Sequence, residues 1–405
     1  MSIIKDPSLA EQGKRKIEWV EKNMPVLKEI SEEPIRRQIF RGFKIGMSIH
    51  LEAKTAFLAL ILKEAGAKVY ATGCNPLSTQ DDVAAALAAE GVEVYAIHDA
   101  DEKAYWDHIH SVLANKPDLI IDDGGDLLKA WMESFPREKY PIIGGCEETT
   151  TGIHRLHELE NQGKLPIPMM DINGARCKHL FDNHHGTGQS VMTAIMSITN
   201  LAVAGKTFVV AGYGNCGSGI AKRASGLGAI VIVTETNPVK ALQAVMDGFQ
   251  VMSMEEAAPL GDYFVTATGV PNVITGKHLE KMHDNVFLAN AGHFDVEINL
   301  EDLKDIKFSR FRIKRRTNIE TYELWNGHEL HLLAEGRLVN LAAGDGHPAE
   351  IMDMSFSLQF LGLKWLLDHK SNLATLPAKV YDIPPELDDL VARTKLKTMG
   401  ITIDE

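Results

Sequence analysis

The sequence predicts an α/β protein with two doubly wound parallel-sheet lobes, the second of the Rossmann type, and a short helical tail at the C-terminus. Three observations carry this prediction. Strand-like and helix-like segments alternate from about Phe43 onward, which is typical of a parallel sheet with crossover helices. A second alternating series starts near Gly205 and contains a glycine-rich loop. The length of 405 residues also fits two or three domains better than one.

The first forty residues carry helical signals. Asp6-Pro7-Ser8 is typical of a helix start, and apolar residues recur at helical spacing through Ile17, Val20 and Leu27. Further along, the apolar run Ala56–Leu62 has lysines on both sides. It predicts a buried helix, because a membrane-spanning helix needs about 20 apolar residues.

The first lobe continues with strands that end in polar loops. Strands are predicted at Lys68–Ala71, Val92–Ile97 and Leu119–Ile121. The loops Gly73–Pro76 and Asp122–Asp126 follow the first and the third of these strands. Ligands of doubly wound sheets bind at the carboxyl ends of the strands, so we expect these loops to line a site.

The second lobe repeats the pattern and leads into the tail. Its strands are predicted at Lys206–Ala211, Ala229–Thr234, Tyr263–Thr266 and Val286–Ala289. A glycine loop at residues 212–217 and a helix at Ser218–Leu227 separate the first two strands. The tail, from about Pro377, is charged and is predicted to be helical.

The glycine loop fits the dinucleotide-binding pattern G-x-G-x-x-G. Gly212 permits a tight turn, Gly214 lets the backbone approach a pyrophosphate, and Gly217 lets helix and strand pack closely. The pyrophosphate is expected at the helix N-terminus, beside Asn215. Glu235 ends the next strand, where its carboxylate can accept hydrogen bonds from ribose hydroxyls and would repel a 2′-phosphate. The pattern therefore predicts NAD in preference to NADP.

Composition excludes several classes of protein. Asp and Glu number 55 against 42 Lys and Arg, for a net charge of −13, and the one basic cluster, Arg310–Arg316, is too small for a nucleic-acid binder. Met1–Lys16 has no apolar core of a signal peptide, so the cytoplasm is expected, with no membrane partner. None of the four cysteines forms a C-x-x-C pair, so neither disulfides nor a metal site is expected.

Eight motifs along the chain resemble those of the adenosylhomocysteinase (S-adenosyl-L-homocysteine hydrolase) family. They are Ser78-Thr79-Gln80-Asp81, Asp122-Asp123-Gly124-Gly125-Asp126, Glu147-Glu148-Thr149-Thr150-Thr151-Gly152, Phe181-Asp182-Asn183, Val210-Ala211-Gly212-Tyr213-Gly214, Gly292-His293-Phe294-Asp295-Val296-Glu297, Ala334-Glu335-Gly336-Arg337-Leu338-Val339-Asn340 and Gly346-His347-Pro348. The resemblance implies reversible hydrolysis of a nucleosyl-homocysteine. In that chemistry NAD oxidises the 3′-hydroxyl, which acidifies the C4′ hydrogen. Homocysteine then leaves from C5′, water adds, and NADH returns the hydride.

The resemblance also implies the domain organisation. A substrate-binding lobe at residues 1–184, completed by 347–372, and an NAD-binding lobe at 185–346 would enclose a cleft. Residues 373–405 would form an oligomerisation tail. The expected assembly is a homotetramer that keeps one tightly bound NAD per subunit.

The matching motifs carry catalytic roles onto five residues of the first half. By resemblance, Lys178 and Asp182 lie at the 3′-hydroxyl, and Lys178 accepts its proton during oxidation, for which an ammonium must first lose its charge. Glu148 hydrogen-bonds the ribose hydroxyls. Asp123 is the candidate for proton transfer at C4′, and His50 serves water and the leaving group at C5′.

The same resemblance assigns roles in the second half. His293 joins His50 at C5′, and His347 with Phe294 forms a gate for homocysteine. The remaining predicted NAD contacts are Thr149, Thr150, Thr151, Asn183, Glu235 and Asn340.

The nucleobase site departs from many relatives, which have His-x-Thr-x-Gln-Thr where this chain has His50-Leu51-Glu52-Ala53-Lys54-Thr55. With adenine, Glu52 would accept from the 6-amino group and Lys54 would donate to N1. With hypoxanthine, Glu52 would accept from N1–H and Lys54 would donate to O6. S-adenosyl-L-homocysteine is the main expectation, and S-inosyl-L-homocysteine, the substrate of some archaeal relatives, is the alternative. A third interpretation is that the two side chains pair with each other and select neither base.

Other departures concern supporting residues. Asn173-Gly174-Ala175 replaces Asn-Asp-Ser, and Thr187 replaces a cysteine of many relatives. The sequence given ends at Ile401–Glu405 without a Lys/Tyr-containing segment that in many relatives reaches a neighbour's NAD. The grip on NAD is therefore expected to be weaker or to use the partner differently.

Two other classes of function compete with the hydrolase interpretation. A plain NAD dehydrogenase would release NADH, and a non-catalytic nucleotide-binding regulator would have lost catalytic residues. None of Lys178, Asp182, His50 and His293 is lost. The intact set favours the enzyme.

Overall fold

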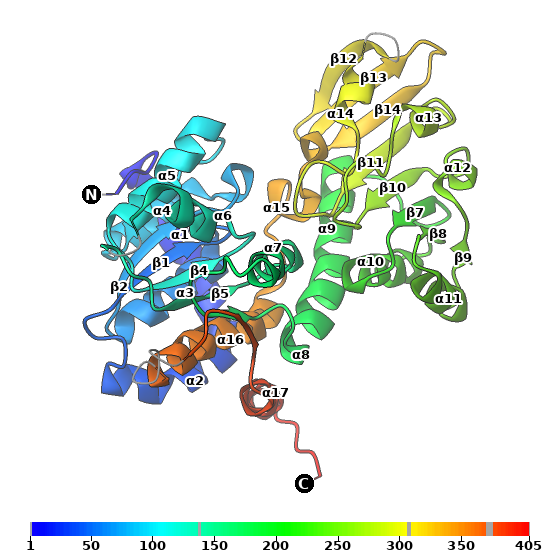
Figure 1. Ribbon diagram of the computed structural model, residues 1–405. Helices are drawn as coiled ribbons and strands as arrows, with labels where there is room; N and C mark the ends of the chain where they lie inside the picture. The colour runs from blue at the N-terminus through cyan, green and yellow to red at the C-terminus, as the bar shows by residue number, and fades with distance from the viewer. Residues whose placement is uncertain (1, 137–138, 306–308, 370–375, 405) are drawn as a thin grey trace. The chain divides into compact units, whose positions relative to one another are not determined.

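The computed structural model describes residues 2–136, 139–305, 309–369 and 376–404. Its contacts divide the chain into two units (Figure 1). The first unit comprises Met1–His179 and Ala349–Glu405, and the second comprises Leu180–Pro348. The predicted start of a separate tail, at residue 373, lies outside the described residues.

The described residues of the first unit form one parallel sheet with the strand order β15-β6-β5-β4-β1-β2-β3. The strands are β1 (Lys44–Ser48), β2 (Lys68–Thr72), β3 (Glu93–Val94), β4 (Leu119–Asp122), β5 (Gly144–Glu147), β6 (Met169–Asp171) and β15 (Val380–Asp382). The chain runs outward from β1 to β3, then returns to β4 and runs in the opposite direction. The carboxyl ends of β1 and β4 therefore flank the topological switch point, where ligands of such sheets bind.

Helices cover both faces of this sheet. They are α1 (Ala10–Lys22), α2 (Pro25–Arg37), α3 (Ala53–Glu64), α4 (Asp81–Ala89), α5 (Glu102–Ala114), α6 (Asp126–Ser134), α7 (Thr150–Asn161), α8 (Arg176–Lys178), α16 (Ala349–Asp368) and α17 (Pro385–Thr398). Successive residues of β4 point to opposite faces, as the pleat requires. Leu119 and Ile121 join one hydrophobic core, which includes α3 and α16, and Ile120 joins another, which includes α5 and α6.

The sheet of the second unit has the order β12-β13-β14-β11-β10-β7-β8-β9. Its strands are β7 (Thr207–Ala211), β8 (Ile230–Thr234), β9 (Gln250–Val251), β10 (Tyr263–Thr266), β11 (Val286–Asn290), β12 (Ser309–Arg316), β13 (Ile319–Leu324) and β14 (Glu329–Leu333). The part from β14 to β9 is parallel, and its switch point lies between β7 and β10. The glycine loop follows β7, so it lies where a doubly wound sheet binds its ligand.

The helices of the second unit also lie against two cores. They are α9 (Thr187–Thr199), α10 (Asn215–Gly226), α11 (Pro238–Met246), α12 (Met254–Ala257), α13 (Gly276–Leu279), α14 (Leu300–Lys304) and α15 (Val339–Ala342). Along β7, Phe208 and Val210 enter the core that contains α9 and α10, whereas Val209 enters the opposite core. The Rossmann-type organisation predicted for this lobe is confirmed.

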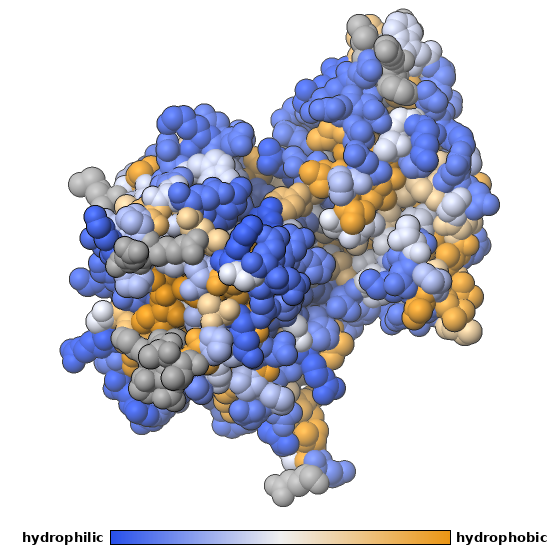
Figure 2. Space-filling model, viewed as in Figure 1, coloured by the Kyte–Doolittle hydropathy of each residue, from blue (hydrophilic) through white to orange (hydrophobic). Residues whose placement is uncertain are grey.

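One helix of the second unit presents apolar side chains to solvent. On α11, Val239, Leu242, Val245 and Met246 are exposed by 74%, 56%, 50% and 77%. Figure 2 shows orange side chains around this helix. Contiguous exposed apolar surface of this kind is typical of an interaction face.

The structure corrects two predicted element bounds. The strand predicted at Val92–Ile97 is reduced to β3, because this edge strand pairs over only two residues with β2. The loop predicted at residues 212–217 ends early, because α10 already begins at Asn215. The second half of the glycine pattern is thus the first turn of the helix.

Two features of the sheets were not predicted. In the second unit β12 and β13 run antiparallel and extend the parallel strands as a hairpin, since short turns can connect only antiparallel neighbours. In the tail, β15 precedes the helix α17 and pairs with β6 of the first sheet. The predicted helix of the tail is confirmed as α17, whereas Val380–Asp382 ahead of it form a strand instead of helix.

A buried carboxylate joins three helices of the first unit. Asp353 of α16 is fully buried and accepts hydrogen bonds from the backbone N–H groups of Val26 (3.0 Å) and Leu27 (2.8 Å) at the start of α2. The Lys395 Nζ of α17 lies 3.6 Å from the same carboxylate. Helix α2 has no capping side chain of its own at Met24, so Asp353 supplies the cap from a distant part of the chain.

We expect Asp353→Ala to lower the free energy of unfolding by about 2–4 kcal/mol, because two buried N–H donors lose their acceptor. Urea denaturation measures this change. Ser357→Ala is the matched control on α16, since the Ser357 hydroxyl only donates to the Asp353 carbonyl, at 2.6 Å. Its expected loss is about 1 kcal/mol or less. Equal losses in the two variants would contradict the capping role.

Candidate active site

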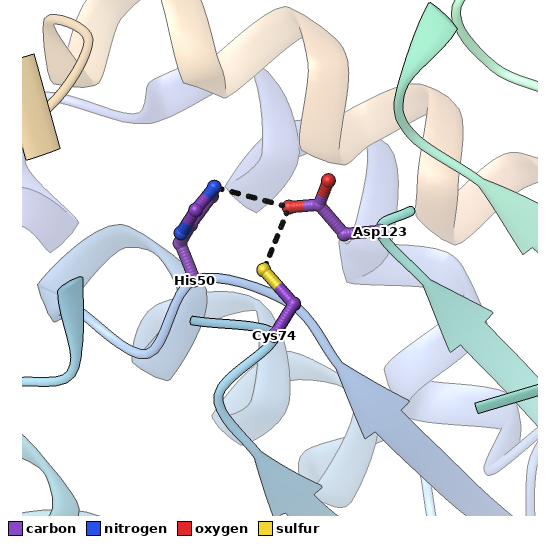
Figure 3. A group of neighbouring side chains, drawn as sticks. All are labelled: His50, Cys74 and Asp123. Atoms are coloured by element: carbon purple, nitrogen blue, oxygen red, sulfur yellow. Dashed lines mark hydrogen bonds and ion pairs between the residues drawn. The ribbon is translucent and has the colours of Figure 1, made fainter. Parts of the chain in front are cut away.

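Three strand-end loops bring polar side chains together at the switch point of the first unit. His50 follows β1, Cys74 follows β2 and Asp123 follows β4, and their side chains converge (Figure 3). The Asp123 Oδ2 lies 3.4 Å from the Cys74 Sγ and 3.6 Å from the His50 Nε2. The structure thus places two predicted catalytic residues in contact and adds a cysteine to which the sequence assigned no role.

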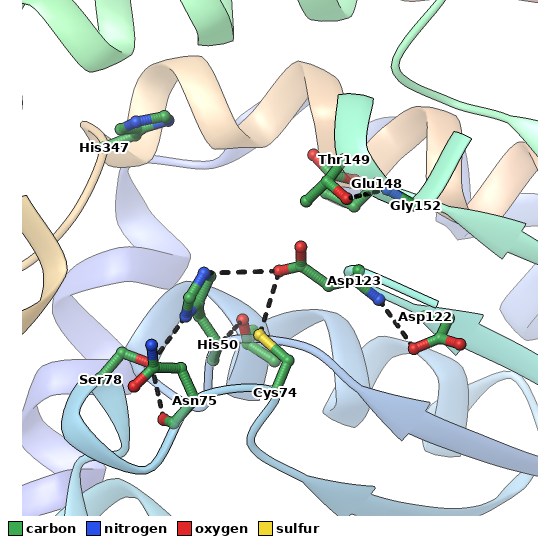
Figure 4. Close-up of polar contacts among 12 residues, drawn as sticks. His50, Cys74, Asn75, Ser78, Asp122, Asp123, Glu148, Thr149, Gly152 and His347 are labelled. Atoms are coloured by element: carbon green, nitrogen blue, oxygen red, sulfur yellow. Dashed lines mark hydrogen bonds and ion pairs between the residues drawn. The ribbon is translucent and has the colours of Figure 1, made fainter. Parts of the chain in front are cut away.

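The ring of His50 is held from its other side. Its Nδ1 lies 2.6 Å from the Ser78 Oγ, and the Ser78 hydroxyl donates to the Asn75 carbonyl at 2.9 Å (Figure 4). Both residues belong to the loop and short 3-10 turn after β2, where Asn75 also caps the turn. Ser78 belongs to one of the motifs that resemble the family. The sequence could therefore single out this residue, but it could not predict the contact with His50.

Two fully buried carboxyl groups hold the loops that carry the acidic site residues. Asp122 accepts from the N–H of Asp123 at 3.0 Å and from the first turn of α6. Glu147 accepts from the N–H groups of Gly124 and Thr149, both at 2.9 Å. Burial raises the pKa of Asp122 to about 7. Burial and then the neighbouring Asp122 raise the pKa of Glu147 well above its usual range.

A second buried group surrounds Glu148, the residue after β5. Its Oε2 accepts from the Gln359 Nε2 at 2.6 Å, and its Oε1 lies 3.5 Å from the Lys178 Nζ. Lys178 also donates to the Asn173 Oδ1 at 3.3 Å. Glu148 and Lys178 are each 5% exposed, so the two charges depend on each other and on these amides. Sequence reasoning missed Gln359, which lies 211 residues from Glu148 and has no local motif.

The predicted nucleobase residues lie at the N-terminus of α3. Glu52 is the N-cap and accepts from the Lys54 N–H at 3.0 Å, while its Oε2 lies 2.7 Å from the Lys54 Nζ. Both side chains are buried, as is Thr55, whose hydroxyl donates to the His50 carbonyl at 2.6 Å. Glu52 and Lys54 therefore form an ion pair next to the His50 loop.

The predicted threonine contacts begin α7. Thr149 is its N-cap, which donates to Glu147 and accepts from the Gly152 N–H at 2.9 Å. Thr150 and Thr151 lie in the first turn, exposed and half-buried. A Cβ at Gly152 would come within 2.1 Å of the Glu147 carboxyl carbon, so glycine is required there.

The glycine loop of the second unit fits a bound dinucleotide. Gly212 has φ +95°, which favours glycine, and a Cβ at Gly217 would lie 1.9 Å from the Gly212 carbonyl oxygen. A Cβ at Gly214 would meet only the Lys240 Nζ, at 3.9 Å, which leaves open space at the helix start beside Asn215. This space matches the approach of a pyrophosphate to the helix N-terminus.

Glu235 lies at the end of β8, beside this loop. Its carboxylate accepts from the N–H groups of Tyr213 (2.7 Å) and Asn237 (2.8 Å). Burial opposes ionisation, but these donors prevail and lower the pKa of Glu235. An ionised carboxylate here suits ribose hydroxyls and opposes a 2′-phosphate, in keeping with the prediction of NAD.

Asp182 and His347 form a pair within the second unit. Asp182 is 2% exposed, lies in a π-helical segment at His179–Gly186, and contacts the His347 Nδ1. The other ring nitrogen of His347 lies 3.2 Å from the Thr187 Oγ1. The residue predicted to gate the site is therefore held by a predicted catalytic carboxylate. Lys178, the predicted partner of Asp182, belongs to the first unit.

The other predicted residues of the second unit lie in three places. His293 and Phe294 follow β11 and make an edge-to-face contact with centroids 4.7 Å apart. Asn340 is 1% exposed, donates to Ser190 at 3.0 Å, and has a buried Oδ1 without a hydrogen-bond partner. An orphaned buried acceptor indicates room for a donor from a bound group. Asn183 is also buried, in the π-helical segment.

Comparison with known proteins gives consistent matches along the chain. Residues 2–140 match the family model described as S-adenosyl-L-homocysteine hydrolase, and residues 183–346 match its NAD binding domain. The chain is 52% identical to the S-inosyl-L-homocysteine hydrolase of Methanocaldococcus jannaschii, over 100% of this chain and 96% of that protein. It is 52% identical to the adenosylhomocysteinases of Thermococcus kodakarensis (99% and 94% covered) and Thermotoga maritima (97% and 96% covered).

These matches confirm NAD as the cofactor and an enzyme that acts on small molecules. Within the described part of the chain, no helix combines the length and apolar character that a membrane crossing requires. With both halves matched and half of all residues identical to full-length relatives, the chain belongs to the S-adenosyl-L-homocysteine hydrolase family.

Proposed function

We propose that this enzyme reversibly hydrolyses S-adenosyl-L-homocysteine to adenosine and L-homocysteine. The observation that carries the proposal is the set of buried acid–base groups at the strand ends of the first unit: His50, Asp123, Glu148 and Lys178. Buried titratable groups gathered at a switch point are typical of catalytic sites. The substrate-binding role of this unit and the NAD-binding role of the second unit are part of the proposal.

The thioether at C5′ has a poor leaving group and no acidic neighbour, so direct hydrolysis is slow. Bound NAD supplies a hydride acceptor and donor at the 3′ carbon, where a ketone makes the C4′ hydrogen acidic. Glu235, Asn340, Asn183 and the glycines of the loop would hold the cofactor. All proton movements fall to side chains of the chain.

The Glu148 and Lys178 pair serves the ribose in this proposal. Glu148 accepts hydrogen bonds from the hydroxyls, and Lys178 takes the 3′-hydroxyl proton after it has lost its own. Gln359 and Asn173, which contact Glu148 and Lys178, keep the two side chains oriented. Asp182 is proposed to work at the same hydroxyl.

The Asp123 and His50 pair serves C4′ and C5′. Asp123 removes and returns the C4′ proton, and the Cys74 thiol, 3.4 Å from its Oδ2, helps to orient the carboxylate. His50, with His293, protonates the homocysteine thiolate and activates the water that replaces it. His347 and Phe294 are proposed to gate the homocysteine path.

S-inosyl-L-homocysteine is the second candidate substrate, and the buried Glu52–Lys54 ion pair favours considering it. The pair presents a carboxylate and an ammonium side by side, 2.7 Å apart. Hypoxanthine offers N1–H and O6 to such a pair, and both contacts would be charge-assisted. Two relatives that are 52% identical over the whole chain are named S-inosyl-L-homocysteine hydrolases.

A homotetramer in the cytoplasm is also part of the proposal. The apolar face of α11 supports self-association, since monomers seldom expose such a patch. The four cysteines are free, as in a reducing compartment. Residues 376–404 would contribute to the assembly through α17.

Lys178→Ala should lower turnover by at least about 10³-fold, because the 3′-hydroxyl loses its proposed proton acceptor. The NAD content, measured after denaturation, should stay at one per subunit. Arg176→Ala, an exposed residue of the same short helix, is the matched control and should retain activity. Loss of NAD from the Lys178 variant would assign this lysine to cofactor binding instead.

Gln359→Leu should reduce kcat by about 10–100-fold, because Glu148 loses the donor that orients it. Far-ultraviolet circular dichroism and NAD content should be unchanged. Gln359→Asn tests the role of the amide, since a shorter amide restores part of the rate only if donation to Glu148 matters. An unchanged kcat in the leucine variant would leave Gln359 a packing residue.

The substrate test runs the reaction in the synthetic direction. Purified enzyme is given homocysteine with adenosine or inosine, and loss of the thiol is followed with a thiol reagent. Faster loss with adenosine is the expected result. Faster loss with inosine would make S-inosyl-L-homocysteine the substrate, with Glu52 and Lys54 as its selective pair. No loss with either, in protein that contains NAD, would reject the hydrolase proposal.

A further inference from the structure

The proposed proton acceptor Lys178 lies on α8, a short helix that has no cap of its own. Ala175 occupies the N-cap position in an extended conformation, with φ −62° and ψ 139°, and makes no side-chain cap hydrogen bond. It replaces the serine of many relatives, and serine is a favoured N-cap. The backbone N–H groups at the start of α8 therefore need an acceptor from another part of the chain.

That acceptor comes from α17, which lies beside α8 in the first unit (Figure 1). The Asp388 Oδ2 accepts from the Arg176 N–H at 2.9 Å, and its Oδ1 accepts from the Cys177 N–H at 2.8 Å. The Cys177 thiol donates to the Asp388 carbonyl at 3.4 Å. One residue of α17 thus holds the two residues directly before Lys178, although Cys177 and Asp388 are 211 positions apart in the sequence.

Helix α17 is itself fixed to the rest of the first unit. The Lys395 Nζ donates to the Glu350 carbonyl of α16 at 2.8 Å. Val391 is fully buried in the hydrophobic core that includes α3 and α16. Asp388 therefore has a fixed position from which its carboxylate can hold α8.

The position of α8 decides where the Lys178 ammonium lies. Its Nζ is 3.5 Å from the Glu148 Oε1 and 3.3 Å from the Asn173 Oδ1, and the residue is 5% exposed. A buried side chain with such close partners tolerates little movement of its backbone, because the interior is closely packed. A displacement of about 1 Å at a reacting group can lower a rate by about 100-fold.

We infer that Asp388 is a positioning residue, which holds α8 and with it Lys178 in the geometry that accepts the 3′-hydroxyl proton. The role of Lys178 rests on the proposed function, whereas the hydrogen bonds of Asp388 do not. In the proposed first step, the hydride at C3′ goes to bound NAD and the hydroxyl proton goes to Lys178. Asp388 acts on this step through the backbone of α8 and carries no proton itself.

The first test follows this step directly, as the near-ultraviolet absorbance of bound NADH after the NAD-containing enzyme is mixed with adenosine or inosine. In Asp388→Ala the rate constant should fall about 10–100-fold, while KM changes less than about threefold. NAD content should stay at one per subunit. Asp388→Asn keeps one acceptor oxygen and replaces the alanine variant if that variant does not fold.

Asp389→Asn is the matched control on α17. Asp389 is the exposed neighbour of Asp388, and its carboxylate lies 3.4 Å from the Arg393 Nε. This variant should keep the full rate constant. An equal loss in Asp389→Asn, or an unchanged rate constant in Asp388→Ala, would overturn the inference. A smaller folded fraction with the full rate constant would also overturn it, since Asp388 would then be a structural cap alone.

The second test restores a local cap. Added to Asp388→Ala, the change Ala175→Ser places a hydroxyl where it can accept from the Cys177 or Lys178 N–H, and should recover at least about fivefold of the lost rate. Amide hydrogen exchange of residues 176–178 gives a readout that does not depend on the reaction. Exchange should be at least about tenfold faster in Asp388→Ala and slower again in the double variant.

The inference and the proposed function fail in distinguishable ways. If the unmodified, NAD-containing protein neither forms NADH nor consumes homocysteine with either nucleoside, the proposed function is rejected. Exchange that depends on Asp388 would still support its hold on α8. Hydrolase activity, together with exchange at α8 that does not depend on Asp388, would reject the inference alone.

Discussion

Parallel sheets leave unpaired backbone N–H groups in the loops after their strands, and buried carboxylates satisfy them in both units of this enzyme. In the first unit Glu147, at the end of β5, accepts from Gly124 in the loop after β4 and from Thr149 in its own loop. In the second unit Glu297 accepts from Thr268 and Gly269 after β10. Each carboxylate fixes a loop that carries site residues, because a buried donor without an acceptor is costly.

The close packing of these loops around a buried carboxylate explains why glycine occupies two positions beside Glu147 and Glu297. A Cβ at Gly152 would lie within 2.1 Å of the Glu147 carboxyl group, and a Cβ at Gly292 would lie 1.8 Å from the Glu297 Oε1. Helix α7 and the loop with His293 can approach these carboxylates only without a side chain at those positions. The family motifs that contain Glu147, Gly152, Gly292 and Glu297 thus describe loop packing as much as chemistry.

Local sequence patterns predicted most strands and helices of the fold. They could not predict contacts between residues far apart in the sequence. Short apolar runs predicted β4, β7, β8, β10 and β11 nearly to their ends, because each of these strands is buried on both faces of its sheet. The short strand β15 has no such pattern, since it is an edge strand whose residues are at most half-buried. In the sequence, Asp353 is an ordinary acidic residue within a predicted helix. Its role as the cap of α2 becomes visible only in the folded chain.

The site shows the same division. Resemblance supplied His50, Asp123, Glu148 and Lys178, and parallel topology brought their loops to one edge of the first sheet. Gln359 could not be found in this way, because its contact with Glu148 joins α16 to a loop 211 residues earlier. The contact of Cys74 with Asp123 was equally out of reach, because the two residues belong to different strand-end loops.

In the folded chain, His50, Cys74 and Asp123 meet although 24 and 49 residues separate the cysteine from its two neighbours in the sequence. Their convergence has a general cause. The carboxyl ends of neighbouring parallel strands lie at one edge of the sheet, so loops that are far apart in the sequence meet there. The Cys74 thiol donates to the Asp123 Oδ2, and the Ser78 hydroxyl holds the ring of His50. The two proposed acid–base residues are therefore oriented by side chains from a third loop, which local sequence patterns do not connect to either of them.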